Sequence, residues 1–300
     1  MTTSEERQKL QRFIDMNSEV MLVRVTGGVP ELLIDKQGFQ TRHASIFELI
    51  QILYSERYPY KDTYDPPKDV VFLIYTGDSA RQVRWVGGEL KYLCQSKIVG
   101  VANAIALPDF SFHHWPETRM PAFRAFYEDM KGVPVTEGTF AAKHEQMFWI
   151  GVCTHRDRTH FVERFGNGQK KDFLVKVFSW DHPARTGYVS IPDHGAYKYL
   201  IDIRGSGWSA RVKYLLLLGS VVFIVDRPDK DCWMDQFEPW VHYVPVREDM
   251  SDLEEVFAKV VGDSVLAFRI AQEGQRRAFQ VFSEHNVMAM LHRAICDVSR

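Results

Sequence analysis

The sequence predicts an α/β protein made of two doubly wound, Rossmann-type sheets that face a cleft. Apolar runs such as Asp69–Tyr75 and Ile98–Leu107 are continuous, as in strands buried on both faces of a parallel sheet. Such runs alternate with helical segments in both halves of the chain. The 300 residues, 45% hydrophobic and 25% charged, suit two globular domains. Because such sheets bind ligands outside the carboxyl ends of their strands, we expect the functional site in the cleft.

In the first half, turn residues separate a pair of strands. Gly27, Gly28 and Pro30 lie between the strands expected over Val20–Val25 and Glu31–Asp35. Glycine and proline residues between positions 131 and 138 indicate a boundary that ends a first domain of residues 1–135. The other elements expected here are helices over Met1–Asp15, Ser45–Tyr58 and Pro121–Met130 and strands over Asp69–Tyr75 and Ile98–Leu107.

The second half repeats the alternation of strand and helix. Gly219 lies where a helix C-terminus needs a left-handed residue, so a helix and a strand should follow each other directly. We expect a second domain of residues 136–275 and a C-terminal helix, residues 276–300, that packs back on the first domain. The expected elements are strands over Gln146–Cys153, Phe173–Ser179, Tyr197–Ile203, Ser220–Val225 and Trp240–Val246 and helices over His155–Phe165, Trp208–Leu218, Ser251–Val261, Ser264–Phe279 and Ser283–Asp297.

Charge and cysteine content bear on compartment and partners. A net charge of −2 excludes a global basic field for nucleic acid or an anionic membrane. The longest apolar run, Tyr214–Val225, is 12 residues, short of the roughly 20 of a membrane span. Residues 1–15 are polar and charged, unlike a signal peptide. We expect a soluble cytoplasmic protein with free thiols, since the cysteines have no zinc-type spacing: Cys94, Cys153, Cys232 and Cys296.

The segment Asp193–Phe223 contains the clearest candidate anion site. A predicted strand runs into Gly205, Ser206 and Gly207, and a helix is expected to begin near Trp208 with Arg211 in its first turn. Glycines let a backbone approach a ligand closely, and free N–H groups at a helix start bind anions. A cation at that end of a helix is unfavourable unless an anion lies between. The alternative is a surface arginine on a capped helix.

Local charge adds candidates in the second half. Residues 151–185 hold seven Lys and Arg against four Asp and Glu, whereas residues 226–255 hold ten acids against three bases. Thr154, Arg156 and Arg158 follow a predicted strand at a helix start, where they could bind a polyphosphate with Arg211. Glu238 could bind a ribose hydroxyl. The alternative for each is a solvated surface position.

In the first half, Asp78 ends a buried strand and faces the expected cleft. A carboxylate there could take a proton from an incoming hydroxyl, although a turn or N-cap aspartate is the alternative. Asp109, His113 and His114 follow the next apolar run and are candidates for an acceptor-side surface. Signatures of hydrolases, zinc proteases, P-loops and Rossmann dinucleotide sites are absent from the sequence.

A series of short motifs extends over about Asp193–Gly274. They are Asp193-His194, Tyr197-Lys198-Tyr199-Leu200, Arg204-Gly205, Ser209, Arg211, Gly219-Ser220, Val222-Phe223, EPWVHYVPVREDMSDLEE and IAQEG. In these motifs the sequence resembles glycosyltransferase family 90, which includes the protein O-glucosyltransferases and fungal capsule-associated proteins. In this resemblance Ser209 and Arg211 match positions that hold the nucleotide diphosphate, and Asp78 matches the catalytic base.

The chain also departs from the family pattern. Ile150 stands where members often carry arginine, so Arg156 or Arg158 would supply that charge. Ser79 and Ala80 stand where an aromatic residue and a proline are frequent. Without a recognisable signal peptide, the chain resembles short bacterial or viral members that act on lipopolysaccharide or other glycans.

The resemblance implies a GT-B-like fold and an inverting transfer of glucose or xylose from a UDP-sugar to a hydroxyl of a glycan, lipopolysaccharide or glycoprotein. The second domain would hold the donor and the first the acceptor. No DxD-type acidic pair precedes the donor segment, so we expect no essential metal. The alternative is a catalytically inactive nucleotide- or glycan-binding module on the same fold.

Overall fold

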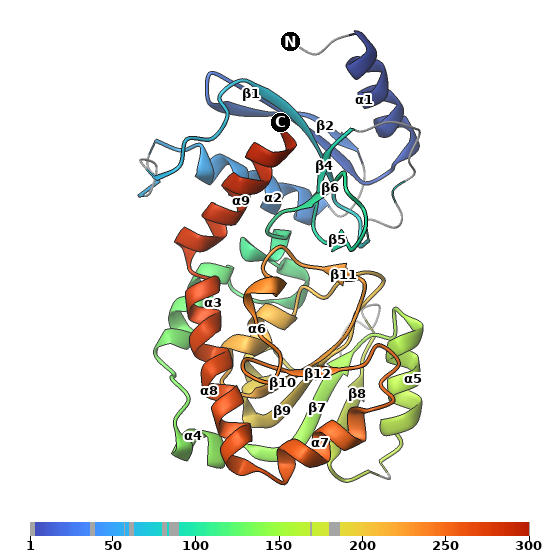
Figure 1. Ribbon diagram of the computed structural model, residues 1–300, viewed down its shortest axis with the longest axis vertical. Coiled ribbons are helices and arrows are strands. Elements are labelled where there is room, and N and C mark those ends of the chain that lie inside the picture. The colour runs from blue at the N-terminus through green and yellow to red at the C-terminus, as the bar shows by residue number, and fades with distance from the viewer. Residues whose placement is uncertain are drawn as a thin grey trace.

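Two α/β lobes lie one above the other along the long axis of the molecule (Figure 1). Met1, Ala80, Asp181 and Arg185 lie outside the described residues. The computed structural model describes residues 4–36, 40–56, 58–59, 63–79, 83, 90–168, 170–179 and 187–299.

The first lobe is built on a mixed five-stranded sheet of order β2-β1-β3-β4-β6. Its β1 pairs antiparallel with β2 and β3, whereas β3, β4 and β6 are parallel. The C-terminal helix α9 contacts α2, β4 and β6, which places the end of the chain in this lobe. The elements are α1 (Ser4–Met16), β1 (Val20–Thr26), β2 (Val29–Lys36), α2 (Gln40–Leu53), β3 (Val70–Tyr75), β4 (Tyr92–Cys94), β5 (Lys97–Ile98), β6 (Ala104–Ala106) and α9 (Glu284–Val298).

The predicted strand pair is confirmed as the antiparallel hairpin β1–β2. Gly27 and Gly28 form its turn with φ of 56° and 82°, and two consecutive positive φ values are the requirement of a tight hairpin turn. Pro30 lies in β2 rather than in the turn. It is tolerated because β2 is an edge strand.

Two predictions in this lobe were wrong in detail. The single strand over Ile98–Leu107 is divided into β5 and β6, because Gly100 with φ 93° turns the chain between them. The helix expected over Ser45–Tyr58 begins at Gln40 and ends at Leu53. The three-residue strand β4 was not predicted, since so short an apolar run gives no periodic signal.

The second lobe is built on a parallel five-stranded sheet of order β12-β10-β9-β7-β8. Read from β8, the chain order is 2-1-3-4-5, so the winding direction reverses between β7 and β9. The elements from the connection onward are α3 (Phe123–Lys131), α4 (Glu137–Ala141), β7 (His144–Gly151), α5 (Arg156–Phe165), β8 (Phe173–Val177), β9 (Tyr197–Asp202), α6 (Val212–Leu217), β10 (Val221–Val225), β11 (Asp229–Lys230), β12 (Val244–Val246), α7 (Leu253–Val261) and α8 (Ser264–Val281).

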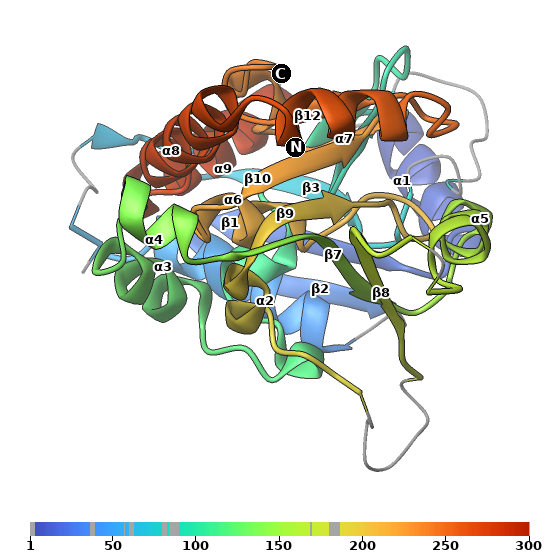
Figure 2. The same ribbon diagram turned by 90° about the horizontal axis from the view of Figure 1, so that it is seen from below.

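Both faces of this sheet are buried, as the continuous apolar runs predicted. In β10, Val221 and Phe223 pack in a core with α5 and α7, whereas Val222 and Ile224 pack in a core that continues into the first lobe. Figure 2 shows α7 and α8 beside the sheet, with α5 near its β8 edge. A two-stranded ribbon of β5 and β11 also joins the lobes.

Gly219 has the predicted left-handed conformation, with φ of 62°, between α6 and β10. A Cβ at this position would lie 2.7 Å from the Cβ of Val135, so close packing also requires glycine. The strand expected over Trp240–Val246 is only β12, since Trp240 has φ of 64° and begins a turn. All four cysteines are free. Among the described residues, no helix has the length and hydropathy needed to cross a membrane.

Candidate functional site

A cavity of about 530 Å³ lies at the carboxyl ends of β7 and β9, where the order of the parallel strands reverses. The second lobe contributes Ile150 and Gly151 from β7, together with Gly205, Ser206 and residues 208–211. The first lobe contributes Arg42, Asp78 and Phe110. The cavity therefore occupies the cleft between two α/β sheets, and the predicted GT-B-like arrangement is confirmed. Only the second sheet is parallel and doubly wound, because an antiparallel hairpin makes the first sheet mixed.

The cavity separates the predicted site residues into two groups. Those in its wall are Asp78, Thr154, Arg158, Gly205, Ser206, Trp208, Ser209 and Arg211. Those that do not line it are Arg156, Gly207, Glu238, Asp109, His113 and His114.

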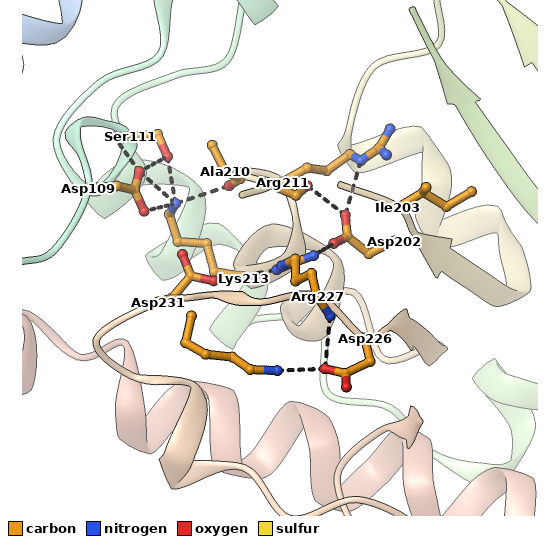
Figure 3. A network of polar contacts seen from close by, with 12 residues as sticks. Asp109, Ser111, Asp202, Ile203, Ala210, Arg211, Lys213, Asp226, Arg227 and Asp231 are labelled. Carbon is orange, nitrogen blue, oxygen red and sulfur yellow. Dashed lines mark hydrogen bonds and ion pairs between the residues drawn. The ribbon is translucent and has the colours of Figure 1, made fainter. Parts of the chain in front are cut away.

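Arg211 is held in the wall by a buried carboxylate. Its Nη1 donates to the carbonyl of Ile150, and its Nε lies 3.7 Å from Oδ1 of Asp202. The Asp202 carboxylate also accepts hydrogen bonds from Ser209 Oγ at 2.7 Å and from Arg227 Nη1 at 2.6 Å. Figure 3 shows Arg211 and Arg227 directed toward the Asp202 carboxylate. Arg211 is thus fixed in place, and its Nη2 has no hydrogen-bond partner among the described residues.

The electrostatics of this group follow from burial and charge. Burial alone would raise the pKa of Asp202, but the charges of Arg227 and Arg211 and the Ser209 hydrogen bond hold it below its ordinary value. Burial lowers the pKa of the Arg211 guanidinium, against the charge of Asp202. An anion in the cavity would replace the solvation that the guanidinium has lost.

The helix expected to begin near Trp208 begins instead at Val212, so that prediction was wrong. Arg211 is the residue before α6 and its φ and ψ are −80° and −31°. The segment 205–210 is a loop closed by a hydrogen bond from Gly205 N to the Trp208 carbonyl at 3.3 Å. With α6 only six residues long, the arginine side chain rather than a helix start is the cationic group here.

Gly207 is required by the packing of the two lobes. A Cβ there would lie 1.6 Å from the backbone oxygen of Asp78, so only glycine permits this contact. Gly205 meets only ordinary contacts, the nearest being Arg158 Nη2 and Thr154 Oγ1 at 3.6 Å. At Gly207 the backbone of the loop therefore packs against the backbone of the other lobe. This corrects the expectation that a ligand approaches the loop closely at this glycine.

Arg158 forms hydrogen bonds to the chain just after both strands at the cavity, β7 and β9. Its guanidinium donates to the carbonyl of Ile203 at 3.2 and 3.0 Å and to that of Val152 at 3.1 Å. Burial, and then the charge of Arg211, lowers its pKa to about 9, so it stays protonated at neutral pH. The neighbouring Thr154 hydroxyl accepts from the same guanidinium at 3.4 Å.

Arg156 and Glu238 do not reach the cavity. The Arg156 side chain is 90% exposed and its Nε lies 3.6 Å from Asp157 Oδ1. Arg156 and Arg158 are two positions apart on α5, so they point in different directions. Glu238 is exposed, and its backbone N–H donates to His242 Nδ1 at 2.8 Å.

The three acceptor-side candidates have structural partners. Asp109 is buried and pairs with Lys213, whose Nζ lies 2.8 Å from Oδ2, and it also caps Ser111 N at 2.9 Å. His113 pairs with Glu48, and the carbonyl of His114 accepts from Ser45 Oγ at 3.3 Å. These contacts explain why Asp109, His113 and His114 do not line the cavity.

Asp78 belongs to the first lobe and lies in the cavity wall, where its side chain is about one-third exposed. Its Oδ1 is 2.7 Å from Nη1 of Arg42, an arginine on α2 whose guanidinium lies over the Phe110 ring at 5.0 Å. Arg42 itself lines the cavity and was not predicted, because 36 residues separate it from Asp78. Asp202 was also not predicted, although an acidic residue at the end of an apolar strand could have been recognised in the sequence as a candidate site residue.

Several buried polar atoms in the wall have no hydrogen-bond partner among the residues that the structure describes. They include Trp208 Nε1, His194 Nε2 and Arg211 Nη2. Buried polar groups are usually paired, so such a concentration marks a place where a ligand supplies partners. No group of three or more His, Cys, Asp or Glu with a metal-binding arrangement occurs in the described ranges.

Comparison with known proteins identifies the family. Residues 94–294 match Glycosyl transferase family 90, and because this is more than half of the chain, the chain belongs to that family.

Individual relatives match in part. Protein O-glucosyltransferase 1 of Rattus norvegicus is 42% identical over 88 residues, 29% of this chain and 22% of the relative. Protein O-glucosyltransferase 3 of Homo sapiens is 25% identical over 236 residues, 76% of this chain and 46% of the relative. The chain spans less than half the length of these relatives. The C-terminal domain of a glycosyl transferase group 1 family protein from Francisella tularensis aligns at 11% identity with a TM-score of 0.34, over 51% of this chain and 89% of that domain.

The Lys213–Asp109 pair should stabilise the contact between lobes. Replacing Lys213 by Met leaves a buried carboxylate without its cation, which costs about 3–5 kcal/mol. Adding Asp109→Asn removes that charge while keeping an acceptor for Ser111, so the double variant should be more stable than Lys213→Met alone. Urea denaturation measures both free energies of unfolding.

The matched control is the exposed pair of Lys230 and Asp226, whose side chains are 40% and 66% exposed. Lys230→Met should cost less than about 1 kcal/mol. Equal losses from Lys213→Met and Lys230→Met would contradict the role of the buried pair.

Proposed function

We propose that this protein is an inverting glycosyltransferase that moves glucose or xylose from a UDP-sugar to a hydroxyl group of a glycan, lipopolysaccharide or glycoprotein. The observation that carries the proposal is Arg211, a buried arginine in the cavity at the strand-order reversal, whose Nη2 has no hydrogen-bond partner in the described part of the chain. Family membership supports sugar transfer, and the names of the relatives favour glucose. A cytoplasmic location stays a prediction.

In this proposal the first lobe supplies the base, and the second lobe supplies the group that stabilises the leaving diphosphate. Asp78 takes the proton of the acceptor hydroxyl, whose oxygen then forms a bond to the anomeric carbon of the sugar. The bond from that carbon to the β-phosphate oxygen breaks in line, and UDP leaves with the electron pair. Arg211 stabilises the charge that develops on the diphosphate, and Ser209 and the 205–208 loop lie beside it.

A donor screen tests the function against its alternative. UDP-glucose and UDP-xylose are incubated with the protein and released UDP is measured, in the presence and absence of EDTA. We expect release of UDP that survives EDTA, since arginine side chains supply the positive charge at the leaving group. Loss of all activity in EDTA that manganese restores would contradict this leaving-group chemistry.

The alternative is a catalytically inactive binding module. The Arg42–Asp78 ion pair favours this alternative, because Arg42 occupies one carboxylate oxygen of the predicted base. Binding of UDP with neither hydrolysis nor transfer for any donor and glycan acceptor would establish the module.

Replacing Arg211 tests the diphosphate site. Arg211→Ala removes a charge-assisted contact of about 1.5–3 kcal/mol, so UDP affinity should fall roughly tenfold to a hundredfold. Arg211→Lys should restore only part, because an ammonium cannot bridge two phosphate oxygens as a guanidinium does. Isothermal titration calorimetry measures both.

Arg156→Ala is the matched control, since that side chain is exposed and outside the cavity. It should leave UDP affinity unchanged. If Arg211→Ala and Arg156→Ala bind UDP equally well, Arg211 does not hold the diphosphate.

Replacing Asp78 tests the base. Asp78→Asn keeps the shape but cannot take a proton, so transfer should fall by about 10²–10⁴ while UDP affinity stays constant. Asp65→Asn, at an exposed position of the same lobe, is the control and should be silent. Initial rates with a working acceptor give the comparison. Transfer by Asp78→Asn within about threefold of wild type would mean that Asp78 has a structural role.

A further inference from the structure

His194 is a buried histidine in the cavity wall that no step of the proposed reaction uses. It lies in a short 3-10 helix, Pro192–Ala196, just before β9. The side chain is 3% exposed, and its ring packs edge-on against Phe148 with centroids 5.0 Å apart. The residue nevertheless lines the cavity, as do Val189 and Ile191.

The hydrogen bonding of this ring is incomplete. The Val189 backbone forms a hydrogen bond with the ring that raises the pKa of His194. Such a bond favours a protonated ring nitrogen, so the Val189 carbonyl is the acceptor. Nε2 is buried and has no partner among the described residues, which assigns the Val189 bond to Nδ1. Burial, and then the charge of Arg211, lowers the pKa of His194 to about 3, so the ring is neutral at pH 7. A neutral ring with its proton on Nδ1 leaves a lone pair on Nε2.

That lone pair limits what can bind beside it. Phosphate oxygens are acceptors and would be repelled by another acceptor, whereas a hydroxyl can donate to it. Trp208 in the same wall presents the opposite polarity, since its buried Nε1–H is an unpartnered donor. A wall with one free acceptor and one free donor suits a ligand with several hydroxyl groups, which both donate and accept.

We propose that His194 Nε2 accepts a hydrogen bond from a hydroxyl of the transferred sugar and thereby makes His194 a specificity-determining residue for the donor. This inference rests on the proposed function. His194 lines the same cavity as Arg211, the arginine assigned to the diphosphate, and the charge of that guanidinium acts on the ring. The sugar and the ribose are both bonded to that diphosphate and both carry hydroxyl groups. We assign the contact to the sugar, and UDP, which has the ribose but no sugar, separates the two.

The test compares UDP with UDP-glucose in the variant His194→Phe. Phenylalanine preserves the ring packed on Phe148 but has no lone pair. By calorimetry without acceptor, UDP affinity should stay within about twofold of wild type while UDP-glucose affinity falls roughly fivefold to tenfold. His194→Gln retains an acceptor and should restore part of the loss. His160→Phe, at an exposed position on α5, is the control and should change neither affinity.

Monodeoxy analogues of UDP-glucose identify the hydroxyl. The analogue that lacks the partner hydroxyl should bind wild type and His194→Phe equally, whereas the other analogues should keep the difference. Equal weakening of UDP and UDP-glucose would overturn the inference, because the contact would then lie on the nucleotide or act through the fold. Unchanged UDP-glucose affinity in His194→Phe and in His194→Gln would also overturn it. Failure of wild type to bind UDP at all would instead remove the proposed function, and the inference with it.

Discussion

The Asp202 carboxylate is fully buried at the end of β9, and the carboxyl edge of the parallel sheet is arranged around it. A buried charge is tolerated only when it is paired and hydrogen-bonded. Arg227 and Ser209 satisfy the carboxylate directly, and Arg211 lies alongside at 3.7 Å. Because Asp202 needs these partners, Arg211 is held against the end of β7. The direction of its Nη2 group is therefore set by these side-chain contacts and not by a helix.

The same edge is also where the lobes are joined. Asp229 is buried between Arg204 Nη2 at 3.2 Å and the Ser79 hydroxyl at 2.7 Å, one from each lobe. Gly207 admits the Asp78 backbone, and Tyr188 donates to the Thr118 carbonyl at 2.7 Å. These contacts fix Asp78 of the first lobe against the loop that precedes Arg211 in the second. The proposed base in one lobe and the proposed anion-binding group in the other are thus positioned by buried polar contacts between the sheets.

Features set by local backbone geometry could be predicted from the sequence. Gly27-Gly28 and Gly219 have the expected left-handed conformations, because a tight turn and a helix end each need glycine at a defined place. Contacts between distant residues could not be predicted. The pairing of Arg42 with Asp78 and of Lys213 with Asp109 spans 36 and 104 residues, and no local pattern encodes it. The choice between Arg156 and Arg158 depended on which face of α5 meets the strand ends, which the charge pattern did not specify.

A crystal structure of the protein with UDP tests the central claim most directly, because a second cavity of about 1080 Å³ lies at the ends of β10 and β12 beside Arg227 and Asp231. The account predicts the diphosphate in the cavity at the ends of β7 and β9, with a phosphate oxygen within hydrogen-bond distance of Arg211 Nη2. UDP bound in the second cavity, with Arg211 unengaged, would contradict it.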